Sequence, residues 1–74
     1  MAYHLGDHIK FTTSKGEQMG RIQSYFRQDS QAGPILAEVR PLKSLQNGTL
    51  ISCAALVEVP PENFLEKADI LAIR

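Results

Sequence analysis

Apolar and polar residues alternate along much of this chain with a period of two, which is typical of β-strands buried on one side. The clearest run is GRIQSYFRQD at 20–29, and one face of it would carry Gly20, Ile22, Ser24 and Phe26. The other face would carry Arg21, Gln23, Tyr25 and Arg27. The pattern predicts a strand with one face in the core. It leaves open whether the second, cationic and aromatic face binds a ligand or is only solvated.

Other stretches with strand character are HIKFTT at 8–13, ILAEVRPL at 35–42 and TLISCAALVEV at 49–59. In the first, Ile9 and Phe11 alternate with polar residues and should be buried. In the second, one face would carry Ile35, Ala37 and Val39, and the other Leu36, Glu38 and Arg40. The third is apolar on both faces over 50–57, so we expect it to be the most central strand.

Glycine and polar residues mark the connections between these stretches. A turn at Gly6 and Asp7 leads into the first strand, and Gly16 suits a tight turn after it. The longest polar loop is QDSQAGP at 28–34. Asn47 and Gly48 stand between two apolar runs, which predicts a hairpin turn. Gly20, inside a strand, predicts a bulge or a close approach of two backbones.

The C-terminal part begins with two prolines that should end the long apolar run. Pro61 suits the first position of a one-turn helix, which would place Phe64 or Leu65 over the open end of the sheet. ADILAIR at 68–74 is then predicted as a short fifth strand, because Ile70 and Ile73 are β-branched. A helix over 61–73 is the competing interpretation.

These elements predict one all-β domain over residues 1–74. Five short strands cannot form a well-covered flat sheet in a chain of 74 residues. Curling into a small barrel removes most of the exposed strand edges, so we expect a small barrel.

Three short motifs resemble a known family: Gly6-Asp7 before the first strand, Gly20-Arg21-Ile22 in the second, and Arg40-Pro41 at the end of the third. In this order they are similar to the Src-homology-3 and Tudor superfold, and most similar to the barrel of a bromo-adjacent homology domain. The resemblance implies a five-stranded Src-homology-3-like barrel with a one-turn 3₁₀ helix before the last strand. It also implies recognition of a protein tail or of nucleic acid in a chromatin or genome-associated, nuclear setting, and it does not imply catalysis.

The resemblance covers about residues 5–42, and the chain departs from the family in two ways. It is shorter than a full bromo-adjacent homology domain, and it has no tryptophan. Two alternatives follow: this is the bare barrel of that family, or it is a different small barrel with similar turns.

Charge and composition narrow the classes of function. Lys and Arg number 8 and Asp and Glu number 8, so the basic excess typical of nucleic-acid binding is missing overall. The basic residues gather in 10–43 and the acidic ones in 58–69. Either the molecule is bipolar, or these charges are only scattered over a solvated surface.

Cys53 is the single cysteine, so no disulfide forms within the chain, and we expect it to be a small buried side chain.

No apolar stretch is long enough to span a membrane, and the N-terminus does not read as a signal peptide, so we expect an intracellular protein.

Catalytic and metal-binding patterns are weak. His4 and His8 have metal-ligand spacing only on a helix, and Gly6 between them favours a turn with exposed histidines. We therefore expect no metal, no cofactor and no enzymatic activity. A methyl-lysine cage would have to use Tyr3 and Tyr25, and two rings make a poor cage.

Two binding hypotheses remain. A protein-interaction or assembly module, with self-association as one form, would use an apolar patch made of Leu36, Leu42, Leu45, Leu50 and Leu56. A nucleic-acid-binding barrel would use a basic and aromatic face made of Arg21, Tyr25, Arg27, Arg40 and Lys43. We rank the protein module first and the nucleic-acid barrel second.

Overall fold

The computed structural model describes residues 3–29 and 33–68, and this part of the chain is all-β. Its elements, in chain order, are β1 His8–Thr13, β2 Gly16–Arg27, β3 Ile35–Ser44, β4 Leu50–Ser52, β5 Val57–Val59, the 3₁₀ turn η1 Pro61–Asn63, and β6 Phe64–Lys67. The first three strands lie where alternation predicts them. Within the described residues no helix is long and apolar enough to cross a lipid bilayer.

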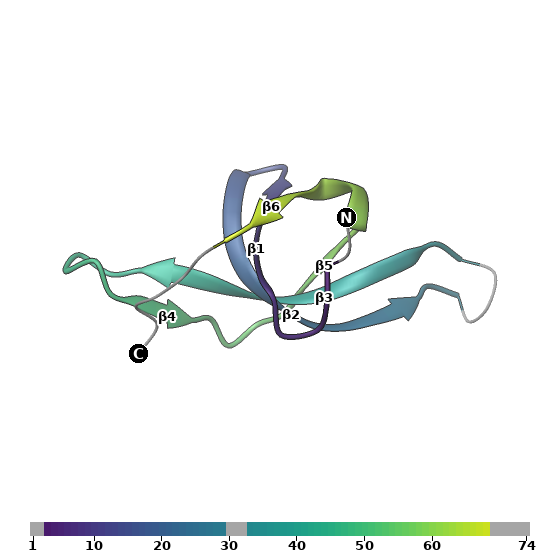
Figure 1. Cartoon of the computed structure of the whole chain (residues 1–74), viewed down its shortest axis with the longest axis horizontal. Coiled ribbons are helices and arrows are strands. Elements are labelled where there is room, and N and C mark those ends of the chain that lie inside the picture. The colour runs from purple at the N-terminus through teal and green to yellow at the C-terminus, as the bar shows by residue number, and fades with distance from the viewer. Residues whose placement is uncertain (1–2, 30–32, 69–74) are drawn as a thin grey trace.

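The strands form a single antiparallel sheet in the order β4-β3-β2-β1-β6, with β5 also pairing with β3. The prediction of five strands is therefore wrong in number: the described residues form six strands, and no pairing joins β4 to β6 to close a barrel. Figure 1 shows how the sheet curls at its centre, where β1, β6 and η1 rise over β3 and β5. Two hairpins extend from this centre in opposite directions, which gives the molecule extents of 44 × 24 × 20 Å.

The core lies in this curled centre. Ile9 and Phe11 from β1, Ile22 from β2 and Val39 from β3 are almost completely buried, as the alternation predicts. Ala37, Val59 and Phe64 complete the cluster, and Tyr3 packs against it with its ring edge-on to Phe64 at 5.1 Å between centroids. The core therefore joins residues from both ends of the described chain.

A β-bulge in β2 changes which residues share a face. Ile22 lies opposite Val39 and Ser24 lies opposite Glu38, so that Gln23 has no partner on β3. Because one extra residue reverses the alternation beyond it, Tyr25 lies on the core side of the sheet, opposite the buried Ala37. The prediction that Ser24 and Phe26 share the core face with Ile22 is wrong for this reason, and both are only half-buried.

Gly20 lies at a close approach of two strands, as its position inside a strand predicts. It pairs with Pro41 on β3 and with Ile9 on β1. A Cβ atom at this position would lie 2.5 Å from Val39 Cγ1 and 2.8 Å from the carbonyl oxygen of Arg40. Only glycine lets β2 pass this near to β3.

The apolar stretch 49–59 is not the central strand that its composition predicts. It divides into β4 and β5, and both pair with the same side of β3, which makes them edge strands. The break falls at Cys53, whose N–H donates to the carbonyl of Pro41; proline has no N–H to offer in return. The Nη1 of Arg40 instead donates to the carbonyls of Cys53, at 3.0 Å, and Ala54, at 3.1 Å, and so satisfies acceptors that β3 leaves without a donor.

After the two prolines the chain makes one 3₁₀ turn, as predicted, with Pro61 at its start. Phe64 follows as the first residue of β6, pairs with Phe11 on β1 and enters the core, while Leu65 is 48% exposed. Phe64 is therefore a strand residue of the core and not part of a helical plug. The predicted strand at 68–74 lies outside the described residues, apart from Ala68, whose N–H donates to the His8 carbonyl at 2.8 Å.

The hairpin between β3 and β4 has the turn that Asn47 and Gly48 predict. Leu45 donates its N–H to the Thr49 carbonyl at 2.8 Å, and the Asn47 side chain accepts from the Thr49 N–H at 3.0 Å. Gly48 has a φ of +84°, a conformation that other residues adopt at a cost. This turn closes the hairpin of residues 42–52, which we call the β3–β4 arm.

Candidate functional site

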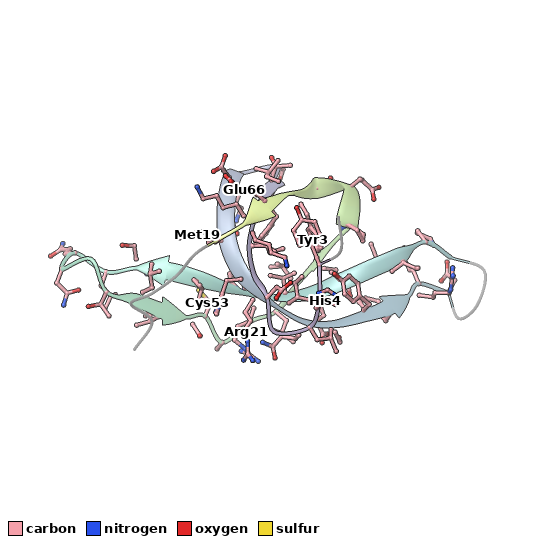
Figure 2. All side chains as sticks on the ribbon, in the orientation of Figure 1. Tyr3, His4, Met19, Arg21, Cys53 and Glu66 are labelled. Atoms are coloured by element: carbon pink, nitrogen blue, oxygen red, sulfur yellow. The ribbon has the colours of Figure 1, made fainter. Side chains whose placement is uncertain are left out.

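The structure does not gather the predicted basic and aromatic residues on one face. Register places Arg21 opposite Arg40 on the outer side of the sheet, away from the core, while Tyr25 and Arg27 lie on the other side because of the bulge at Gln23. In Figure 2 the Arg21 side chain extends from the side of the sheet opposite η1 and β6. Lys43 is exposed near the end of β3. The five residues therefore do not form one continuous surface.

Each of the three arginines in this set donates to a backbone carbonyl. The Nε of Arg21 donates to Gly6 at 3.3 Å, and the Nη1 of Arg27 donates to Gly33 at 3.3 Å. Arg40 binds the chain between β4 and β5, as described above. No ion pair involves an arginine within residues 3–29 and 33–68. These guanidiniums hold turns and loops in place, which accounts for their positions without a ligand.

Tyr25 and Tyr3, the rings that a cage would need, are used within the fold. The hydroxyl of Tyr25 donates to the Tyr3 carbonyl at 3.0 Å, and the Tyr3 ring packs on Phe64. Burial, together with the Asp7 carboxylate, raises the pKa of the Tyr25 phenol. Tyr25 therefore fastens the N-terminal segment to β2, although 37% of its surface remains exposed.

Asp7 organises the turn before β1. Its Oδ2 accepts from the backbone N–H of His4 at 2.9 Å and lies 3.4 Å from the Lys67 ammonium. The His4 hydrogen bond is the main cause that lowers the pKa of this carboxyl; Lys67 adds to it, and desolvation opposes both. His4 is exposed as predicted, whereas His8 is half-buried in β1. These groups form a structural turn that ties β6 to the N-terminal segment.

A shallow groove of about 330 Å³ lies on the outer side of the sheet, and its lining comprises Lys10, Glu17, Gln18, Met19, Leu42, Ser44 and Leu50. Figure 2 places Met19 in the angle between the β1–β2 hairpin and the β3–β4 arm. The apolar part of the groove is Met19, Leu42 and Leu50. Leu42 and Leu50 belong to the leucine patch that the sequence predicts, but nothing in the sequence shows that β2 bends away from the arm and opens this angle.

The predicted leucine patch is partly wrong. Leu36 is 8% exposed and lies opposite Phe26, so it does not belong to an exposed patch. Leu42 and Leu50 are half-buried in the groove, while Leu45 and Leu56 are 41% and 37% exposed. Ile51, which sequence reasoning missed, is 37% exposed on β4. The exposed apolar side chains of this region thus belong to the arm and to the segment that follows it.

Candidate ligands for a metal do not converge in the part of the chain that the structure describes: no three His, Cys, Asp or Glu side chains come together there. Cys53 is a free thiol and only half-buried, so the expectation of a fully buried small side chain is wrong. Its backbone N–H donates to the Pro41 carbonyl at 2.8 Å. Cys53 is therefore at the point where the chain leaves β4, between the arm and β5.

The Arg40 bonds lead to a prediction for stability. Arg40→Ala is expected to lower the free energy of unfolding by about 1–2 kcal/mol, because hydrogen bonds from a charged donor are worth more than neutral ones and this guanidinium is partly exposed. Lys43→Ala, which removes an exposed cation three residues further on, should change it by less than about 0.5 kcal/mol. Urea unfolding followed by circular dichroism measures both. Equal effects of the two substitutions would show that Arg40 does not hold the β4–β5 connection.

No known family model, curated protein or solved structure matches this chain. The resemblance to bromo-adjacent homology barrels and the nuclear setting it implies therefore remain predictions.

Proposed function

We propose that this chain is a non-catalytic recognition or assembly module that binds a protein partner through the β3–β4 arm. The observation that carries the proposal is the exposed apolar surface there. Leu45 and Ile51 on this projecting hairpin, and Leu56 in the segment that follows it, are each more than a third exposed. Exposed apolar patches mark interaction sites, and an open strand edge can take up a partner strand through main-chain hydrogen bonds.

We also propose a more specific fold than an all-β sheet, namely a small barrel related to the Src-homology-3 type. The antiparallel order of β1, β2 and β3, and the 3₁₀ turn immediately before β6, support a small barrel of the Src-homology-3 type. The open sheet in the described residues and the long β3–β4 arm are departures from that barrel. Both departures leave strand edges accessible, which favours a binding role.

Protein binding is better supported than nucleic-acid binding. A nucleic-acid surface needs cations and aromatic rings on one face, and the bulge at Gln23 separates Arg21 and Arg40 from Tyr25 and Arg27. The arginines are moreover held by backbone carbonyls. The arm, by contrast, offers its apolar side chains without any such internal role.

The test is a selection of short peptides on the immobilised protein. Peptides from a random display library are selected on the wild type, with Ile51→Lys as the counter-selection, and the enriched peptides are then measured by fluorescence anisotropy. We expect extended apolar peptides that bind the wild type at least about tenfold more tightly than Ile51→Lys, because the added charge lies at the edge.

The same protein is titrated with labelled single-stranded and double-stranded nucleic acid at about 50 and 200 mM salt. Salt-sensitive binding that Arg27→Ala abolishes would replace the proposal with the nucleic-acid alternative. Peptides that bind wild type and Ile51→Lys equally well would exclude the arm as the binding surface.

A further inference from the structure

The strands that border the sheet differ in their protection against pairing with another strand. β6 carries Glu66 and Lys67 and has a bulge at Leu65, and β5 has Glu58 at its centre. Charged side chains, prolines and bulges are the common devices that keep an edge strand from pairing. β4, with the sequence Leu50-Ile51-Ser52, has none of them. Among the described edge strands, β4 is thus the one whose only protection of this kind is its short length of 3 residues.

The surroundings of β4 are uncharged over a long stretch. Residues 44–57 contain no Asp, Glu, Lys or Arg, and the nearest charged residues in sequence are Lys43 and Glu58. A strongly charged partner strand would find no countercharge along this stretch. A partner that is itself uncharged and apolar suits it better, and this chain contains such a strand.

The hydrogen-bond pattern shows which backbone groups β4 offers. The Leu45 N–H donates to the Thr49 carbonyl, and the Cys53 N–H donates to the Pro41 carbonyl. In an antiparallel ladder the bonded pairs alternate, so that Lys43 and Ile51 form the bonded pair between these two. The N–H and C=O groups of Leu50 and Ser52 therefore point away from β3, toward the open edge.

We propose that β4 pairs antiparallel with β4 of a second copy of this chain; the inference rests on the proposed function and identifies its partner. In this pairing Leu50 bonds to Ser52 of the second copy, and Ser52 bonds to its Leu50. Ile51 then faces Ile51 of the second copy across the two-fold axis, about 4.5–5.5 Å away between Cβ atoms. The contact is self-complementary, as a two-fold interface requires.

Electrostatics does not oppose this contact. Among the residues that the structure describes, the cation next to β4 is Lys43, which lies opposite Ile51 on β3. Three strand spacings would separate the two Lys43 residues, which is about 14 Å. This exceeds the screening length of about 8 Å at physiological salt, so their repulsion is weak. The groove beside Met19, Leu42 and Leu50 adjoins the same edge and adds apolar surface.

The dimer should be weak, because β4 is only 3 residues long. An interface well below about 1,000 Å² gives transient association, so we expect a dissociation constant on the order of 100 µM. Sedimentation equilibrium from about 10 µM to 1 mM covers the transition on that expectation. The wild type should pass from monomer to dimer over this range.

Two substitutions test the contact in different ways. Ile51→Lys places two ammonium groups opposite each other at the axis and should weaken dimerisation at least about tenfold. Ser52→Pro removes an N–H that points outward and should abolish the dimer while β3–β4 pairing persists, since proline is tolerated on an edge. Circular dichroism and thermal unfolding confirm that each variant is folded. The matched control is Leu65→Lys on the opposite edge strand, which should dimerise like the wild type.

The outcomes separate this inference from the proposed function. Hydrogen exchange of the Leu50 and Ser52 amides should become slower as the protein concentration rises. A monomer at 1 mM, or protection of these amides that does not depend on concentration, would overturn the two-fold pairing. If selected peptides still bind the wild type and not Ile51→Lys, the proposed function stands with another partner. If neither dimer nor peptide binding is seen, both proposals fail.

Discussion

Gly20→Ala is expected to lower the free energy of unfolding by about 3 kcal/mol, as for overpacking in a tight core. The new methyl group would lie 2.5 Å from Val39 Cγ1, 2.8 Å from the Arg40 carbonyl oxygen and 3.1 Å from Phe11 Cε1. One of these neighbours is backbone, so the strain cannot be relieved by a side-chain rotation alone. Total stability for a chain of this length is about 4 to 11 kcal/mol, so the loss should be obvious in urea unfolding.

A double-mutant cycle identifies the cause of this loss. Val39→Ala removes the nearest contact, so the double variant should be less destabilised than the sum of the two single variants, by about 0.5–3 kcal/mol. Gly16→Ala serves as the control, because a Cβ there meets nothing within 4 Å and its only cost comes from a φ of +108°. Strict additivity of Gly20→Ala and Val39→Ala would contradict the close approach of β2 to β3.

Phe64→Ala should cost about 3–4 kcal/mol, as is usual for removing a large aromatic side chain from a core. Phe64 is 9% exposed, joins β6 to Phe11 across the sheet, and supports the Tyr3 ring. Its loss should therefore loosen both β6 and the N-terminal segment. Thermal unfolding measures the effect, with an expected fall of the midpoint by more than about 12 °C.

The neighbouring residue provides the control for Phe64. Leu65→Ala removes a side chain that is 48% exposed and should change stability by less than about 0.5 kcal/mol. Phe64→Leu, which keeps most of the apolar volume, should fall between the two. Similar losses for Phe64→Ala and Leu65→Ala would mean that β6 does not insert Phe64 into the core.

Alternation was enough to predict the first three strands and their deepest residues. Ile9, Phe11, Ile22 and Val39 are buried where the pattern puts them. The bulge at Gln23 could not be predicted, because Gln23 is polar and fits the alternation as well as its neighbours do. A bulge is decided by the register with β3, which depends on contacts far apart in the sequence. The single extra residue Gln23 is sufficient to place Tyr25 and Arg27 on the opposite face of the sheet from Arg21.

The prediction for residues 49–59 was wrong because an apolar composition indicates that a stretch is buried, but not whether it forms one continuous strand. Its apolar residues suggest a strand covered on both sides, whereas the ladder ends opposite Pro41 and Arg40 binds the Cys53 and Ala54 carbonyls between two edge strands. The basic residues were misread in a related way. A cationic side chain in a strand looks the same in sequence whether it meets a ligand or a carbonyl of its own chain. The edge at β4 exists because the stretch is divided into two strands. The sequence could therefore predict that apolar surface is exposed, but not that it lies at this edge.

The extended outline of the protein affects how its mass should be measured. The radius of gyration over Cα atoms is 12.6 Å, because the two hairpins lengthen the molecule to 44 Å. A compact chain of this length would have a value of about 11.3 Å. Friction with the solvent rises with elongation, so the monomer should leave a gel-filtration column ahead of spherical standards of 8.2 kDa. The elution volume of the monomer would then suggest a dimer. The oligomeric state therefore has to be determined by a method that measures molar mass independently of friction.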